Sequence, residues 1–216
     1  MNDSGRYEPF IIGITGLSGS GKSWLVNHLI SEFGNSVAVL MYDEYYRPFE
    51  TQKKDANGFV NFDLPEALDS ERCKQDLLQL IEGHPVLIQS YPFEIINPLP
   101  LEYWVPPAPI IVIEGLFFMH HMEIDRLLSA RVFVEADRQN NLERRLKRDL
   151  EKRGISEEKS MYQWMHHVIP AYNSFILPLR DKCDIVIQNN TPEFEQIEQV
   201  RKLIYSKAHP SVLAFL

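Results

Sequence analysis

The feature that most constrains this chain is the segment Gly16-Leu17-Ser18-Gly19-Ser20-Gly21-Lys22-Ser23, which fits the phosphate-binding pattern G-x-x-x-x-G-K-[ST]. An apolar, β-branched run at 10–15 predicts a buried strand before it, and apolar residues at near-helical spacing predict a helix after it. Glycines let the backbone curl so that N–H groups converge on an anion, while the helix N-terminus and the Lys22 ammonium add positive charge. We therefore expect these eight residues to bind the phosphates of a nucleotide, with the Ser23 hydroxyl on a Mg²⁺ ion.

The composition places this loop in an ordinary globular protein. The chain has 216 residues, 44% of them hydrophobic, which suits one domain spanning 1–216. Its net charge of −8 argues against a nucleic-acid-binding surface, and no apolar run is long enough for a membrane span. The polar segment 1–8 has no signal-peptide core, and only two cysteines, Cys73 and Cys183, are present. We expect a cytoplasmic protein with reduced thiols; whether it forms a homo-oligomer stays open.

Two acidic residues follow predicted buried strands and are candidates for chemistry at the phosphates. Asp43 comes just after a strand predicted at 36–41, and Glu114 ends a strand predicted at 110–114. Because ligands bind at the carboxyl ends of parallel strands, both carboxylates should lie near the phosphate loop. Asp43 is expected to accept the proton of an attacking substrate hydroxyl, and Glu114 to hold Mg²⁺ or a water bound to it. In the alternative interpretation each is a capping or turn residue.

Residues 84–109 differ in composition from the rest of the chain, because they contain half of its 14 prolines. Only 86–91 still fits a short strand, since proline is poorly accommodated inside sheets. A long irregular insert beside a phosphate loop more often covers a substrate than supports the core, so we expect a substrate flap. Its aromatic side chains either stack on a planar ring of the substrate or pack the flap onto the core; they are Tyr91, Phe93, Tyr103 and Trp104.

A cationic helix is predicted at 137–153 and ends at Gly154. Its cations are Arg138, Arg144, Arg145, Lys147, Arg148, Lys152 and Arg153. Such a run of basic residues usually forms a solvated helix face. In this chain, however, the net charge is −8 and the run is the one strong cationic cluster, which favours a functional role. Guanidinium groups neutralise the charge that spreads over a phosphoryl group during transfer. We therefore expect a lid at about 137–160 that closes over the nucleotide.

The remaining pattern completes an α/β fold. A helix is expected from Pro65 to the stop at Gly83, and the polar segment 51–58 is expected to be a mobile loop. Further strands are predicted at 130–135 and 184–188, and further helices at 156–179 and 193–206. Strands alternating with helices predict a three-layer α/β sandwich around a five-stranded, mostly parallel sheet.

Together these motifs resemble the uridine kinase family of P-loop nucleoside kinases, over about residues 10–190. Besides the phosphate loop, the matching segments are 42–46 (Tyr-Asp-Glu-Tyr-Tyr), 61–67 (Asn-Phe-Asp-Leu-Pro-Glu-Ala), Glu114-Gly115, the arginine-rich string 144–154, and 170–187. The arginine-rich string and the segment 61–67 are much more specific than the phosphate loop alone. The resemblance implies a P-loop NTPase fold and Mg²⁺-dependent phosphate transfer from ATP, or GTP, to the 5′-hydroxyl of a ribonucleoside.

The resemblance also implies roles for individual residues. Asp43 falls on the family's catalytic base and Asp63 on the carboxylate that holds the ribose hydroxyls. The expected catalytic residues are Asp43, Lys22 and Arg148. The lid arginines expected at the nucleotide are Arg145, Arg148 and Arg153. The residues expected to contact the acceptor are Tyr46, Asp63, Tyr91, Phe93, Arg145 and Gln163.

Two departures from the family pattern concern the acceptor. Ile96 stands where these kinases carry a histidine, and Ile155 stands where they carry an arginine after the lid's Arg-Gly. Apolar residues at these positions cannot supply the hydrogen bonds that discriminate between bases, so uridine and cytidine are not the only candidates. Segment 57–68 also resembles nicotinamide riboside kinases, which are the second candidate family. Other small-alcohol kinases of the same superfamily are the third. A nucleotide-gated switch that phosphorylates nothing is the alternative from another class; such a protein would need no acceptor pocket.

Overall fold

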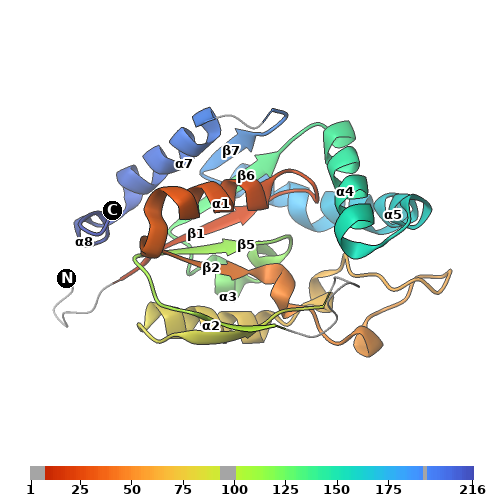
Figure 1. The fold of residues 1–216 in the computed structure, drawn as a ribbon, viewed down its shortest axis with the longest axis horizontal. Helices are drawn as coiled ribbons and strands as arrows, with labels where there is room; N and C mark the ends of the chain where they lie inside the picture. Colours follow the sequence, from red (N-terminus) through yellow and green to blue (C-terminus); the bar gives the residue numbers. More distant parts are fainter. Residues whose placement is uncertain (1–7, 93–100, 192–193) are drawn as a thin grey trace.

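The computed structural model describes residues 8–92, 101–191 and 194–216, and Figure 1 shows their arrangement. A central sheet contains five strands, β1 (Phe10–Thr15), β2 (Val37–Met41), β5 (Ile110–Glu114), β6 (Ala130–Glu135) and β7 (Ile185–Gln188). Their order is β2-β5-β1-β6-β7, and every neighbouring pair is parallel. The predicted α/β class and five-stranded sheet are confirmed.

Helices cover both faces of this sheet (Figure 1), and the central strands β1 and β5 are buried along their whole length. Helices α1 (Lys22–Phe33) and α7 (Phe194–Lys207) pack on one face, and the short helix α8 (Pro210–Leu213) follows α7. Helices α2 (Ser70–Ile81) and α3 (Met122–Asp125) pack on the other. Successive residues of a strand point to opposite faces, and accordingly Ile11 packs on the face covered by α2 and α3, whereas Ile12 packs on the face covered by α1 and α7.

The carboxyl ends of the strands meet helices α4 (Arg138–Arg153) and α5 (Glu157–Gln163) at one end of the molecule (Figure 1). The helix predicted over 156–179 is present, but it changes type along its length. After α5 the chain forms wide π-helical turns at Trp164–Val168 and Tyr172–Ile176, on either side of α6 (Ile169–Ala171), and then 3₁₀ turns at Leu177–Lys182. Pro170 lacks the N–H that a regular α-helix needs at this point, so the regular hydrogen-bond ladder cannot continue through it.

Two further predictions need correction. In the insert, β3 (Val86–Gln89) and β4 (Glu102–Val105) pair as antiparallel strands, whereas the sequence predicts only the first of them. The helix expected from Pro65 starts later: Pro65–Ala67 is a separate 3₁₀ turn, and α2 starts at Ser70. The Asp69 carboxylate caps α2 by accepting from the Arg72 N–H at 3.2 Å, which fixes that start.

None of the helices in the described part of the chain has the length and hydropathy that a membrane-spanning segment requires.

Candidate active site

The phosphate loop joins the end of β1 to the first turn of α1. The loop turns at Ser20, whose N–H donates to the Leu17 carbonyl at 3.0 Å. Gly19 and Gly21 have φ of +82° and +96°, and a Cβ there would lie 2.2 Å from the Asn141 carbonyl oxygen and 1.9 Å from the Asn189 amide nitrogen. These two positions therefore require glycine for conformation and for space. Among the described residues, the start of α1 has no side-chain cap and no acidic residue in its first turn, which leaves it suited to an anion.

Lys22 and Glu114 are buried at the base of this loop, and the exposed Ser23 lies beside them. The Lys22 ammonium donates to the carbonyls of Gly16 at 3.2 Å and Leu17 at 3.3 Å, and lies 3.8 Å from a Glu114 carboxylate oxygen. The Ser23 hydroxyl donates to the other Glu114 oxygen at 3.3 Å. Burial lowers the pKa of Lys22 and raises the pKa of Glu114, while the attraction between the two charges opposes both shifts. A hydroxyl beside a carboxylate is an oxygen set that suits Mg²⁺.

Asp43 lies on the turn that follows β2, close enough that its charge influences the pKa values of Lys22 and Glu114. Its Oδ1 is buried and has no hydrogen-bond partner among the described residues. A buried carboxylate oxygen without a partner is costly, so its position fits an oxygen that binds or activates a ligand. Asp43 therefore stands at the phosphate loop, where the sequence places it.

One cavity of about 420 Å³ connects the phosphate loop to an aromatic wall. Its lining residues are Ser18, Asp43, Tyr46, Phe49, Phe62, Asp63, Tyr91, Pro92, Leu116, Arg145, Arg148, Arg153, Ile155, Lys159 and Gln163. The described residues expected at the acceptor, and the three lid arginines expected at the nucleotide, all belong to this set. Phe93 and Ile96 lie outside the described residues. Tyr103 and Trp104 do not line the cavity, and Trp104 is 64% exposed. The sequence analysis does not predict that Phe49 and Phe62 line the cavity. No motif contains Phe49, whereas Phe62 stands beside Asp63 in the family motif at 61–67.

We call residues Tyr46, Phe49, Phe62, Asp63 and Tyr91 the acceptor wall. The Tyr46 ring lies 5.5 Å from the Phe62 ring and 5.4 Å from the Tyr91 ring, measured between centroids. Asp63 is 8% exposed, and burial raises its pKa while Arg145 opposes the rise. The wall thus presents flat apolar surfaces and one carboxylate, which suit a molecule that has both a ring and hydroxyl groups.

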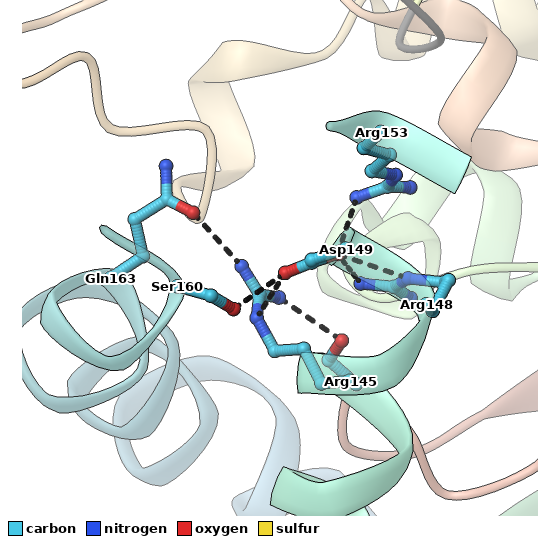
Figure 2. A network of polar contacts seen from close by, with 7 residues as sticks. Arg145, Arg148, Asp149, Arg153, Ser160 and Gln163 are labelled. Atoms are coloured by element: carbon cyan, nitrogen blue, oxygen red, sulfur yellow. Dashed lines mark hydrogen bonds and ion pairs between the residues drawn. The ribbon is translucent and has the colours of Figure 1, made fainter. Parts of the chain in front are cut away.

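The lid arginines turn inward onto one buried carboxylate, as Figure 2 shows. Asp149 is fully buried; its Oδ1 lies 2.9 Å from an Arg148 nitrogen and 3.6 Å from an Arg153 nitrogen, and its Oδ2 lies 3.2 Å from Arg145 Nε. Burial disfavours the ionised form, but Arg145 and Arg148 outweigh it, so the pKa of Asp149 lies below its ordinary value. The Ser160 hydroxyl also donates to Asp149 at 2.7 Å. These arginines are therefore held in place rather than spread over a solvated face.

Arg145 connects the lid to both sides of the cavity. It donates to the Ser18 hydroxyl of the phosphate loop at 3.1 Å and to the Gln163 side-chain oxygen at 3.3 Å. Arg144, its neighbour, instead donates to the carbonyls of Asn189 and Asn190. Adjacent residues on a helix face different directions, so only part of the cationic string reaches the cavity.

The chain matches the model of the Phosphoribulokinase / Uridine kinase family over residues 11–193. The chain belongs to this family. It is 32% identical to the uridine kinase of Deinococcus deserti over 198 residues, which cover 90% of this chain and 96% of that protein. It is 29% identical to uridine-cytidine kinase B of Dictyostelium discoideum over 207 residues, 95% and 85% of the two chains. As a member of this family the chain is an enzyme, a phosphotransferase with an alcohol group as acceptor.

Two solved structures share the fold of this kinase. One is a putative fructose transport system kinase from Silicibacter sp. TM1040, with a TM-score of 0.62 and 17% identity over 80% of this chain and 86% of that one. The other is a possible uridine kinase from Bacillus stearothermophilus, with a TM-score of 0.52 and 20% identity over 83% and 89%. At such identities the likeness concerns the fold alone, so the acceptor has to be argued from the cavity.

Proposed function

We propose that this kinase transfers the γ-phosphate of ATP to a hydroxyl group of a nucleoside, with the 5′-hydroxyl of uridine or cytidine as the first candidate. The observation that carries the proposal is the position of Asp43 in a cavity that has the phosphate loop at one end and the acceptor wall at the other. A switch protein without an acceptor would need only the first of these ends. The names of the relatives support a nucleoside as the acceptor.

The residues at the phosphate end fit ATP and Mg²⁺. The loop, the Lys22 ammonium and the free first turn of α1 suit the β- and γ-phosphates, and Ser23 with Glu114 would hold the metal ion. When bound, Mg²⁺ supplies positive charge that offsets the negative charge of the phosphate oxygens. GTP would present the same phosphates, so this end of the cavity does not select between the two donors.

The reaction then depends on positioning by the chain's own side chains. Asp43 orients the acceptor hydroxyl and takes its proton through the carboxylate oxygen that has no partner in the described residues. Asp63 accepts hydrogen bonds from the sugar hydroxyls, and the aromatic wall lies against the ring of the base. Arg145, Arg148 and Arg153 offset developing charge on the phosphoryl group and exclude water.

A second acceptor is favoured by one observation: Ile155 lines the cavity. An isoleucine cannot donate hydrogen bonds to a pyrimidine, so recognition there depends on shape and on ring stacking. A riboside with a cationic ring, such as nicotinamide riboside, would gain from the electron-rich faces of Tyr46, Phe62 and Tyr91. We therefore keep nicotinamide riboside, and behind it other small alcohols, as alternatives.

The test is a screen of acceptors with Mg²⁺ and ATP, in which ADP formation and the phosphorylated product are both measured. The panel contains uridine, cytidine, adenosine, nicotinamide riboside and simple sugars. We expect at least one nucleoside to raise ATP consumption at least about tenfold and to yield its 5′-monophosphate, with no product when EDTA replaces Mg²⁺. If no hydroxyl compound accelerates ATP consumption, the slow-hydrolysing switch is the better description.

A further inference from the structure

A tight turn at 53–61 lies immediately before Phe62 and Asp63 of the acceptor wall. The Asn61 N–H donates to the Lys53 carbonyl at 2.8 Å, and the Asp55 N–H donates to the Phe59 carbonyl at 2.8 Å. Asp55 Oδ1 also accepts from the backbone N–H groups of Asn57 and Phe59, both at 2.9 Å. The segment 51–58, which the sequence predicts to be a mobile loop, is therefore part of a turn held by backbone hydrogen bonds and by the Asp55 carboxylate.

The other oxygen of Asp55 bonds to a distant part of the chain. Asp55 Oδ2 accepts from the Tyr162 hydroxyl on α5 at 2.7 Å and lies 2.8 Å from Nε2 of His167, in the first π-helical turn. The Tyr162 oxygen accepts in turn from the Asn57 side chain at 2.7 Å. The Tyr162 ring packs on Phe59 with centroids 4.6 Å apart. First the Tyr162 hydroxyl and then His167 hold the pKa of Asp55 well below its usual range, so the carboxylate stays ionised.

The elements on both sides of this contact line the cavity. Phe62 and Asp63 follow the turn directly. On the other side, α5 carries Gln163, which accepts from Arg145, and Ser160, which donates to Asp149. His167 is 2% exposed and close enough to Asp63 that a charge on its ring would lower the pKa of Asp63. The backbone of the turn, its contacts with Tyr162 and His167, the helix α5 and the hydrogen bonds of Arg145 thus connect the acceptor wall to Ser18 of the phosphate loop.

We propose that Asp55, Tyr162 and His167 are positioning residues that fix the acceptor wall to the lid, so that nucleotide bound at the phosphate loop also orders the acceptor end of the cavity. None of the three lines the cavity, so their effect on the reaction passes through Asp63 and Phe62. This inference rests on the proposed function, because it assigns these residues to acceptor binding.

The most specific variant is Tyr162→Phe, which removes the hydroxyl and its two hydrogen bonds but keeps the ring contacts with Phe59 and His166. Because the two lost hydrogen bonds lie outside the cavity and act on the acceptor only through Asp63 and Phe62, we expect the acceptor KM to rise about three- to tenfold, the range of one ordinary hydrogen bond. The KM for ATP and the ATP hydrolysis without acceptor should stay within about twofold, since the phosphate loop is untouched. The matched control is Tyr205→Phe on α7, whose ring is 47% exposed. Asp55→Asn is the second variant and should act in the same direction.

Hydrogen exchange of the whole chain gives a readout that needs no acceptor. In the wild type, a non-hydrolysable ATP analogue with Mg²⁺ should slow exchange at 53–61 as well as at 16–23. In Tyr162→Phe the slowing at 53–61 should be lost, while that at 16–23 remains. The proposal is overturned if the slowing at 53–61 persists in the variant, or if the KM for ATP rises as much as that for the acceptor. A wild type that phosphorylates nothing refutes the proposed function instead, and the exchange result still decides this inference.

Discussion

The two ends of the cavity are built in opposite ways. The phosphate end comes from eight consecutive residues, 16–23, joined by Glu114. The acceptor wall comes from side chains between Tyr46 and Tyr91, and helices α4 and α5 with the turn between them supply further lining residues, from Arg145 to Gln163. A contiguous loop made of backbone N–H groups can bind any nucleotide phosphate, whereas a wall of separate side chains can vary without disturbing the fold. The comparison shows why the chain is readily placed among kinases while its acceptor needs a separate argument.

Asp149 pairs with the three arginines that line the cavity. Its replacement should have the largest effect of the variants considered, measured as a loss of stability. Asp149→Asn keeps the shape and the contact with Ser160 but leaves Arg145, Arg148 and Arg153 without their counter-ion. Removing one partner of a buried ionic cluster costs about 3–5 kcal/mol, so the free energy of unfolding should fall by that amount. Urea denaturation followed by circular dichroism measures the change.

The pH dependence provides the control for that variant. The pKa of Asp149 is lowered in the folded state, so its stabilisation is present above the unfolded value, about 3.9, and is lost as pH falls through the folded value. The difference in unfolding free energy between wild type and Asp149→Asn should therefore shrink below about pH 4. A constant difference down to pH 2 would mean that the ionised carboxylate contributes nothing.

Asp43 stands between the two ends, and Asp43→Asn should leave both binding sites intact while removing the base. We expect kcat to fall about a hundredfold or more, on the scale of lost general-base catalysis, with little change in the KM for ATP. Steady-state kinetics with the acceptor found in the screen measures this. Glu44→Gln is the matched control: the Glu44 carboxylate accepts from the Tyr91 N–H at 2.6 Å, and an amide oxygen can still accept there. Equal losses in both variants would remove Asp43 from the role of base.

How much the sequence predicts differs between these ends for a physical reason. The conformation of the phosphate loop is local, since the two glycines that the motif fixes, Gly16 and Gly21, have φ values of +146° and +96°, which glycine adopts readily. The signal for each of the five strands is also local, because each strand is a short apolar run in the sequence. By contrast, the contact of Asp55 with Tyr162 joins residues 107 positions apart, and no periodicity marks it. Asp63 is predicted only through the resemblance of its segment to a family motif, and Tyr91 also through its place in the proline-rich insert, whereas Phe49 lies in neither.

The acceptor wall should respond to mutation without affecting the phosphate end. Phe62→Leu removes a ring that lies 5.5 Å from Tyr46 and 6.2 Å from Tyr91. Such aromatic pairs contribute about 0.5–1.5 kcal/mol, so the acceptor KM should rise up to about tenfold while the KM for ATP stays unchanged. Phe175→Leu is the control, because that ring also packs edge-on against aromatic neighbours, Phe117 and His120, but does not line the cavity. A parallel rise in the KM for ATP in Phe62→Leu would show that the two ends are not separable.

The two cysteines provide a negative control for both ends of the cavity. Neither cysteine lines the cavity, so neither phosphate binding nor acceptor binding should depend on a thiol. Cys73 is fully buried, and burial raises the pKa of the Cys183 thiol to about 12. Since the thiolate is the reactive form, alkylation of Cys183 by iodoacetamide at pH 8 should be about a thousandfold slower in the folded protein than in urea, where its pKa is about 8.5. Mass spectrometry follows the labelling, and activity is assayed on the same samples. Labelling that is fast in the folded protein and abolishes phosphate transfer would mean that a thiol supports one of the two ends.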